Sequence, residues 1–175
     1  EKLGVPVVRG TEEVKDLPLF FGKKIQIANL DNYSVKIFAE ITDAPNLTVS
    51  EILNRALYYR KNGADVIDLG CLPSTPFPHM EEAIAALKQA GFLVSLDSLE
   101  TEDLLRGGKA GADYLLSLHE STLWIADEVT STPIIIPETH TDLDSLDRAI
   151  KIMQAKNRPF IVDPILDPIH FGFTT

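Results

Sequence analysis

The sequence has little cysteine and no long apolar stretch. Cys71 is the single cysteine among 175 residues, so no disulfide can form within the chain. A chain of this kind fits a reducing compartment, and we expect a cytoplasmic protein. No signal peptide is recognisable and no apolar run is long enough to span a bilayer, which predicts a protein without membrane contact.

Basic residues are also scarce relative to acidic ones. The chain carries 16 Lys and Arg against 26 Asp and Glu, which gives a formal net charge of -10. Binding to a phosphate backbone requires clustered Lys and Arg, so we expect no nucleic-acid partner. With 45% hydrophobic and 24% charged residues, the composition is that of one globular domain with a substantial core.

Six short apolar runs recur along the chain, and helical patterns separate them. The runs are IFAEIT, ADVIDL, FLVSLD, ADYLLSL, TPIIIP and PFIVDP. Several are apolar at consecutive positions, which is typical of parallel strands buried on both faces. Six such units predict an α/β fold, either a TIM-barrel type (β/α) fold or a doubly wound open sheet. A complete barrel has eight strands and about 250 residues, so a barrel here would be incomplete, with parallel strands one to six.

The segments between the runs carry helix signals. Thr48 and Glu51 fit a capping box at the start of a helix that ends before Gly63, and Leu57 is expected on its apolar face. Further helices are expected at 80–90, 102–109 and 122–128 and around 146–153. The helix at 102–109 is weakened by two adjacent glycines.

Residues 1–35 do not fit the repeating unit. They hold two more apolar runs and an acidic helical segment. We expect 1–35 to be an N-terminal cover of the barrel or the remnant of a preceding domain, and 36–175 to be the barrel domain in truncated form.

Polar side chains mark the ends of the runs. They are Glu40, Thr42, Asp68, Ser74, Thr75, Asp97, Ser117, His119, Glu138 and Asp163. In both candidate architectures the ligand binds at the carboxyl ends of the strands, which makes these residues site candidates. A single carboxylate there is about as often a helix N-cap. However, Asp68, Asp97 and Asp163 lie within or directly after apolar runs, where an unpaired charge is costly, so a cationic or donor-rich group should face them.

Other site types find little support. The four histidines show no metal-ligand spacing, so we expect no metal held by protein ligands alone. Cys71 is interpreted as a small loop filler and not as a nucleophile. The sequence contains no glycine-rich phosphate loop and no nucleophile elbow.

Several segments together resemble a known family. GADVIDLGCLPSTPFP, VSLDS, AGADYLLSL and PFIVDP, with HFGF behind it, are similar in matching order to the pterin-binding barrel of dihydropteroate synthase. With IFAEITDAP at the first strand, the chain resembles more closely the dihydropteroate synthase-related proteins of archaea and one-carbon-metabolising bacteria that use tetrahydromethanopterin. The resemblance covers roughly residues 36–173 and implies a TIM barrel.

The resemblance implies roles by position. The pterin-binding positions are Asp97, Ser117, Asp163, Glu40 and Thr42, with Asp97 and Asp163 as the catalytic pair. Ser74 and Thr75 would lie on the anion side, and the secondary candidates are Asp68, Glu138 and His119. A pterin offers a ring N–H and a 2-amino group side by side, and we expect the Asp163 carboxylate to accept both.

The implied reaction joins a pterin methyl diphosphate to an aryl amine, in folate or tetrahydromethanopterin-type cofactor biosynthesis. No tightly bound cofactor is implied, and Mg²⁺ could bind through the substrate diphosphate. Pro76 follows Thr75 where the family has an arginine, and the family's Lys of strand seven and Arg-His of strand eight would fall after Thr175. Two alternatives therefore stay open: a non-catalytic pterin-binding module, and a pterin-dependent methyltransferase partnered with a corrinoid protein. A homodimer is compatible with the sequence.

Overall fold

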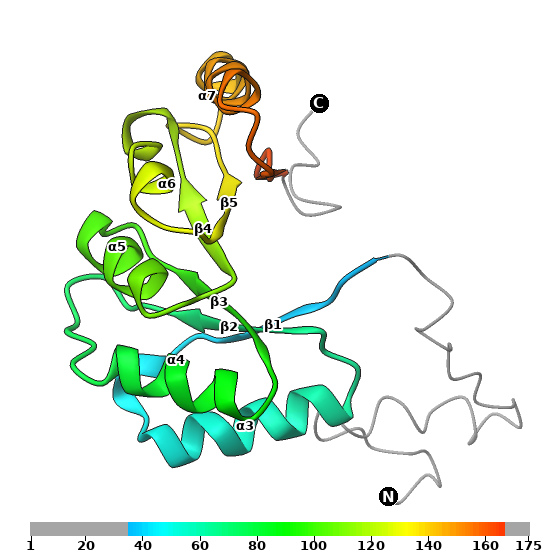
Figure 1. The fold of residues 1–175 in the computed structure, drawn as a ribbon, viewed down its shortest axis with the longest axis vertical. Helices are drawn as coiled ribbons and strands as arrows, with labels where there is room; N and C mark the ends of the chain where they lie inside the picture. The colour runs from blue at the N-terminus through cyan, green and yellow to red at the C-terminus, as the bar shows by residue number, and fades with distance from the viewer. Residues whose placement is uncertain (1–34, 167–175) are drawn as a thin grey trace, which may run out of the picture. The chain divides into compact units, whose positions relative to one another are not determined.

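The computed structural model of the protein describes residues 35–166 (Figure 1). By its internal contacts the chain divides into two compact units, Glu1–Val35 and Lys36–Thr175. Residues 1–34 lie outside the described residues, so a cover or domain remnant at 1–35 stays a prediction.

Six strands form one parallel sheet in the order β1-β2-β3-β4-β5-β6. They are β1 (Phe38–Ile41), β2 (Val66–Gly70), β3 (Leu93–Asp97), β4 (Tyr114–Leu118), β5 (Thr132–Ile135) and β6 (Ile161–Val162). A doubly wound sheet reverses its strand order at a switch point, whereas the strands of a TIM barrel follow one another in sequence. The prediction of a TIM-barrel type fold with strands one to six is therefore confirmed.

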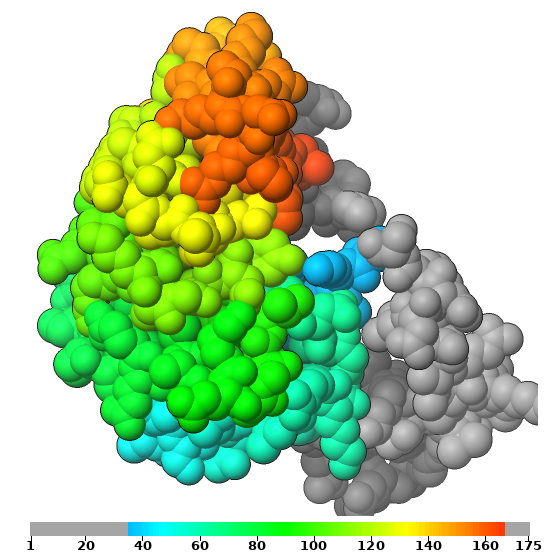
Figure 2. Space-filling view, viewed as in Figure 1, coloured from blue at the N-terminus to red at the C-terminus, as the bar shows by residue number. Residues whose placement is uncertain are grey.

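Helices connect the strands. They are α3 (Val49–Lys61), α4 (Met80–Gln89), α5 (Thr101–Lys109), α6 (Ile125–Glu128) and α7 (Leu143–Ala155), with short 3-10 turns η2 (Ala44–Asn46) and η3 (Glu120–Thr122). Figure 1 shows these helices along one side of the curved sheet. In the space-filling view, the surface they form passes in chain order from cyan to orange, so neighbours in sequence are neighbours in space (Figure 2). The described helices include none that is long and apolar enough to cross a membrane.

The curvature of the sheet brings non-adjacent strands together across its inner face. The rings of Phe38 in β1 and Tyr114 in β4 meet edge to face with centroids 5.2 Å apart. Lys36, just before β1, donates to the Tyr114 hydroxyl at 3.3 Å. Since β2 and β3 lie between β1 and β4 in the sheet, these contacts require the sheet to curl as a barrel does.

The main core lies between the sheet and the helices. The parallel register aligns the fully or almost fully buried side chains of Ile41, Leu69, Leu96 and Leu115 across four strands. They face the buried sides of the helices, which include Ile52, Met80, Ile84 and Leu87. This layer fixes the register of the sheet, because a shift by one residue would turn every apolar side chain to the opposite face.

The helix signals are largely confirmed, with two differences. At α3 the Thr48 backbone N–H donates to the Glu51 carboxylate at 2.8 Å, and the Glu51 N–H donates back to the Thr48 hydroxyl at 3.3 Å, so the capping box is present. Leu57 is 47% exposed, so its placement on the buried face was wrong. Five residues separate Leu57 from buried Ile52, which rotates Leu57 by about 140° around the helix.

The second difference is at 122–128, where one helix was expected. The structure has η3 and α6 instead. The Thr122 hydroxyl accepts from the His119 N–H at 3.0 Å and donates to the His119 carbonyl at 3.1 Å. Thr122 thereby closes a separate tight turn before α6 begins.

The two glycines that weaken α5 in sequence terms have a packing role. A Cβ on Gly107 would lie 2.3 Å from Leu96 Cδ2, and one on Gly108 would lie 2.7 Å from Val129 Cγ1. At Gly107, helix α5 therefore lies so close to β3 that a larger residue would force Leu96 to move.

We predict that Gly107→Ala destabilises the protein by ~1–3 kcal/mol, because overpacking against Leu96 outweighs the gain in helix propensity of ~1 kcal/mol. The free energy of unfolding from urea titration measures the effect. Lys109→Ala, an exposed change in the same helix, is the control and should stay within ~0.5 kcal/mol of the wild type. A Gly107→Ala protein as stable as the wild type would contradict the packing role.

Candidate functional site

A row of polar side chains crosses the inner face of the sheet. The parallel register pairs Glu40 with Asp68, Asp68 with Ser95, and Ser95 with Tyr114. Tyr114 in turn pairs with Thr132. Successive residues of a strand point to opposite faces, so these five share the face opposite the apolar core layer. The barrel interior is thus polar at this level.

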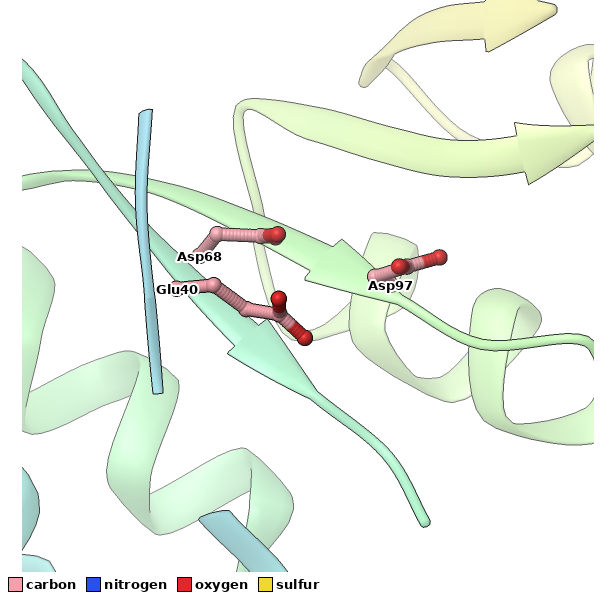
Figure 3. Close-up of side chains that lie close together, drawn as sticks. All are labelled: Glu40, Asp68 and Asp97. Atoms are coloured by element: carbon pink, nitrogen blue, oxygen red, sulfur yellow. The ribbon is translucent and has the colours of Figure 1, made fainter. Parts of the chain in front are cut away.

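Three carboxylates converge at the carboxyl ends of β1, β2 and β3 (Figure 3). Asp97 follows Ser95 by two residues and so lies on the same face of β3. One oxygen each of Glu40, Asp68 and Asp97 lies within 4.8 Å of the others. Gly70 faces Asp97 in the register, and a Cβ there would lie 2.5 Å from Glu40 Oε1. Glycine at this position leaves the space that the Glu40 carboxylate occupies.

Asp68 is the most buried of the three, at 4% exposure. Its Oδ1 accepts a hydrogen bond of 2.6 Å from the Ser95 hydroxyl. Burial, with added repulsion from Asp97 and Glu40, raises the pKa of Asp68 from 3.8 to about 6, although the Ser95 bond acts in the opposite direction. Partial burial and the neighbouring Asp97 likewise raise the pKa of Glu40. Ionisation of these carboxylates therefore lowers the stability of the folded protein.

Asp97 is held from β4. The Ser117 hydroxyl donates to Asp97 Oδ1 at 2.6 Å. Ser117 has φ of 65°, in the left-handed region that non-glycine residues seldom adopt, next to a register shift between Leu115 and Leu118. Irregularities of this kind re-aim side chains near functional sites. Here the irregular backbone accompanies a serine that bonds to Asp97.

A cavity of about 310 Å³ lies beside this carboxylate and is lined by Cys71, Pro73, Asp97, Ser98, Leu99, Glu100 and Ser117. Its volume is in the range of small-molecule sites. Among the described residues, those that line it include no lysine or arginine. The acceptors at its wall suit a ligand that brings its own N–H donors. A second cavity of about 350 Å³, lined by residues such as Lys36, Asp113 and Tyr114, lies toward the amino ends of the strands, where barrels do not place their ligands.

The predicted site residues are brought together only in part. Asp97 and Ser117 line the cavity, and Glu40 and Asp68 join Asp97 in the carboxylate cluster. Thr42 and Ser74 are exposed and, like Thr75, are not among the lining residues. Ser74 has φ of 56°, and the Thr75 hydroxyl donates to the Pro73 carbonyl at 3.4 Å. Their anion-side role stays a prediction.

Asp163 differs most from expectation. Its placement in a buried apolar strand was wrong, because β6 has two residues, Ile161 and Val162, which are 41% and 37% exposed. Asp163 is itself exposed, and its Oδ1 accepts from the Ile165 N–H at 2.8 Å in a local turn. It is not a member of the cluster formed by Glu40, Asp68 and Asp97. Its grip on a pterin stays a prediction.

The secondary candidates His119 and Glu138 form a separate group with Ser121. His119 Nδ1 lies 3.1 Å from Glu138 Oε2 and 2.9 Å from Ser121 Oγ. Ser121 Oγ donates to Glu138 Oε1 at 2.9 Å. Burial raises the pKa of Glu138, but the Ser121 hydrogen bonds and His119 outweigh burial, so the pKa is lowered and the carboxylate stays ionised.

Sequence reasoning missed Ser95 and Gly70. A serine or glycine in a strand carries no functional signal by itself. The alternation of Ser95 and Asp97 within FLVSLD is the trace that could have shown a polar inner face. The histidine spacing likewise gave no indication of the residues that could hold a divalent cation, which are Glu40, Asp68 and Asp97, because their oxygens come from three strands.

Known proteins resemble this chain in sequence and fold. No family model matches it. An uncharacterized protein of Methanocaldococcus jannaschii is 30% identical over 159 residues, covering 80% of this chain and 30% of that protein. The chain therefore spans less than a third of the length of this relative.

Solved dihydropteroate synthases have a similar structure. The Vibrio fischeri enzyme superposes with a TM-score of 0.60 at 19% identity, covering 80% of this chain and 63% of that one. The Anaplasma phagocytophilum enzyme, with bound 6-hydroxymethylpterin-monophosphate, has a TM-score of 0.61 at 19% identity and covers 77% and 68%. The Coxiella burnetii enzyme, in complex with pteroic acid, has a TM-score of 0.60 at 18% identity and covers 78% and 63%. The chain thus has the fold of the dihydropteroate synthases across strands β1 to β6 and the helices that connect them.

The raised pKa of Asp68 predicts a pH-dependent stability. The stability that the folded state gains from the protonated form of Asp68 is fully present below about pH 3.8 and is lost as the pH rises through about 6. A shift of this size corresponds to ~3 kcal/mol at most. Asp68→Asn removes the charge and keeps an acceptor for Ser95, so we expect it to raise the free energy of unfolding by ~1–3 kcal/mol at pH 8 and to change it little at pH 4.

Urea unfolding at both pH values measures this difference. Asp144→Asn, an exposed change in α7, is the matched control and should show no such dependence. The prediction is contradicted if the difference in free energy of unfolding between Asp68→Asn and wild type stays constant or shrinks from pH 4 to pH 8. Folding would then not raise the pKa of Asp68.

Proposed function

We propose that the barrel binds a pterin and belongs to a dihydropteroate synthase-like protein that joins a pterin methyl diphosphate to an aryl amine. The observation that carries this proposal is the Asp97 carboxylate, which is held by Ser117 at the wall of a 310 Å³ cavity beside two further carboxylates. The position of this cavity in a dihydropteroate synthase fold supports the choice of ligand.

The chemistry of a pterin matches these acceptors. Its ring N–H and 2-amino group form one edge of adjacent donors, and charge-assisted hydrogen bonds to carboxylates contribute ~1.5–3 kcal/mol each. Ser117 donates to one oxygen of Asp97, and the cavity lies beside the same carboxylate. The pterin edge would recover the energy that the crowded carboxylates lose by burial. Asp163 is proposed as a second contact to the ring.

The reaction proposed is alkyl transfer. The amine nitrogen forms a bond to the pterin methylene carbon, the carbon–oxygen bond to diphosphate breaks, and the nitrogen loses a proton. The protein contributes by orienting the ring and polarising it through Asp97 and Asp163. For the pathway, we propose synthesis of a tetrahydromethanopterin-type cofactor, which the similarity to an archaeal protein supports.

A diphosphate next to this cluster would be repelled. Pro76 stands where an arginine was expected, and the cavity-lining residues within the described part of the chain are free of Lys and Arg. Glu40, Asp68 and Asp97 are oxygen ligands of the kind that Mg²⁺ prefers, and their oxygens lie within 4.8 Å of one another. The donor edge and the diphosphate lie at opposite ends of a pterin methyl diphosphate, so carboxylates that hold the edge do not reach the diphosphate. We therefore propose that Mg²⁺ would bind through the substrate diphosphate and supply its charge neutralisation there.

A second candidate is a non-catalytic pterin-binding module, which the same lack of basic lining residues favours. The two candidates differ in one measurement. The synthase releases pyrophosphate only when an aryl amine is present, whereas the module binds pterin and releases none. Methyl transfer that requires a corrinoid protein would instead indicate a methyltransferase.

We predict that Asp97→Asn weakens the binding of 6-hydroxymethylpterin by ~10- to 100-fold, because a charge-assisted acceptor is replaced by an amide. Isothermal titration calorimetry gives the dissociation constants. Asp144→Asn is the control and should bind as the wild type does. Equal affinity of the Asp97→Asn protein and the wild type would remove Asp97 from the pterin site.

A further inference from the structure

One ordered polar group lies at the ends of the next two strands and has no part in the pterin contacts described above. His119 directly follows β4, Ser121 lies in η3, and Glu138 follows β5 by three residues. Because β4 and β5 are parallel neighbours, their carboxyl ends meet at the edge of the sheet that also carries the carboxylate cluster. The group therefore belongs to the ligand-binding end of the barrel.

The hydrogen bonds fix which nitrogen of His119 carries a proton. Glu138 is ionised and can only accept, and its Oε2 lies 3.1 Å from His119 Nδ1. The Ser121 hydroxyl donates its proton to Glu138 Oε1 at 2.9 Å. Ser121 Oγ can therefore only accept a hydrogen bond from His119 Nδ1. The consistent assignment places the proton on Nδ1 and leaves the lone pair on Nε2.

The backbone places His119 on the inner side of the sheet. Leu118 is fully buried toward the helices, so the next residue points the other way. His119 lies two residues beyond Ser117, the residue that bonds to Asp97. Two extended residues span ~7 Å, so His119 lies that much farther toward the mouth of the barrel than Ser117. The His119 side chain is 21% exposed. The backbone N–H of His119 donates to the Thr122 hydroxyl, which holds the main chain in place.

Within residues 35–166, the acidic residue next to His119 in the chain has a partner of its own. Glu120, the next acidic residue, pairs with Arg148 of α7 at 2.8 Å. Glu138 is therefore the carboxylate assigned to the imidazole. A carboxylate on one ring nitrogen orients the imidazole and stabilises the imidazolium that forms when the other nitrogen takes a proton.

We propose that His119 is the proton acceptor for the aryl amine, with Glu138 and Ser121 as its positioning residues. This inference rests on the proposed function. As the carbon–nitrogen bond forms and the diphosphate leaves with the electron pair of the carbon–oxygen bond, the amine proton passes to His119 Nε2. The alternative role for the group is a structural clamp between the loops that follow β4 and β5.

Nuclear magnetic resonance of the full chain with ¹⁵N-labelled histidine separates the two roles. We expect His119 to show a protonated Nδ1 and an unprotonated Nε2. His79 is the internal control: its Nε2 lies 2.6 Å from the Leu47 carbonyl oxygen, which requires the opposite tautomer. In Glu138→Gln, which removes the charge, His119 should become a mixture of tautomers, whereas His79 should stay unchanged.

Addition of ligands then tests whether Nε2 of His119 faces the bound substrates. With 6-hydroxymethylpterin saturating, addition of 4-aminobenzoate as the aryl amine should shift the Nε2 resonance of His119 and leave that of His79 in place. A His119 that carries its proton on Nε2, or an Nε2 resonance that does not move with both ligands present, would overturn the inference and leave pterin binding intact. A wild type that does not bind pterin removes the proposed function, and this inference with it.

Turnover provides the second readout. His119→Gln should lower the rate of amine-dependent pyrophosphate release by ~10²-fold or more, with the dissociation constant of the pterin unchanged within twofold. An unchanged rate overturns the inference. A wild type that binds pterin and releases no pyrophosphate also counts against it, because a proton acceptor has no role in a binding module.

Discussion

The in-register pairing of parallel strands is the constraint on which the rest of this structure depends. It places Glu40, Asp68 and Ser95 in one row on the inner face and sets Asp97 one step farther toward the mouth. The same pairing turns Ile41, Leu69 and Leu96 toward the helices. Since the buried apolar layer fixes the register, it also fixes the convergence of the carboxylates. The site is thus specified by the core and not by a separate loop motif.

This arrangement has an energetic cost that is consistent with a binding role. Burial and mutual repulsion raise the pKa of Asp68 and of Glu40, so the folded protein holds acidic groups that would be more stable in water. Hydroxyls of Ser95 and Ser117 offset part of this cost with bonds of 2.6 Å to Asp68 and Asp97. Sites that bind or react are often where a fold sacrifices stability. A donor-rich heterocycle or a divalent cation would each reduce the repulsion.

Local patterns in the sequence predicted the local structure well. The strand runs, the capping box of Thr48 and Glu51 and the sequential strand–helix repeat all depend on residues close in the chain. The predictions that failed have both local and non-local causes. Leu57 was misplaced because five residues rotate it by about 140° from Ile52 around the helix. The burial of Asp163 was overestimated because the short edge strand β6 does not enclose it. The contacts of Ser95 with Asp68, and of His119 with Glu138, join residues that are 27 and 19 positions apart. They meet because neighbouring strands, and the loops that follow them, lie side by side in the sheet.

A crystal structure of the protein with 6-hydroxymethylpterin bound is the most direct test of a pterin clasped by strand-end carboxylates. We expect the heterocycle in the cavity beside Asp97 and Ser117, with its ring N–H edge within hydrogen-bonding distance of a carboxylate oxygen of the cluster. A pterin bound at another surface, or one whose donor edge faces away from all three carboxylates, would contradict this view of the site.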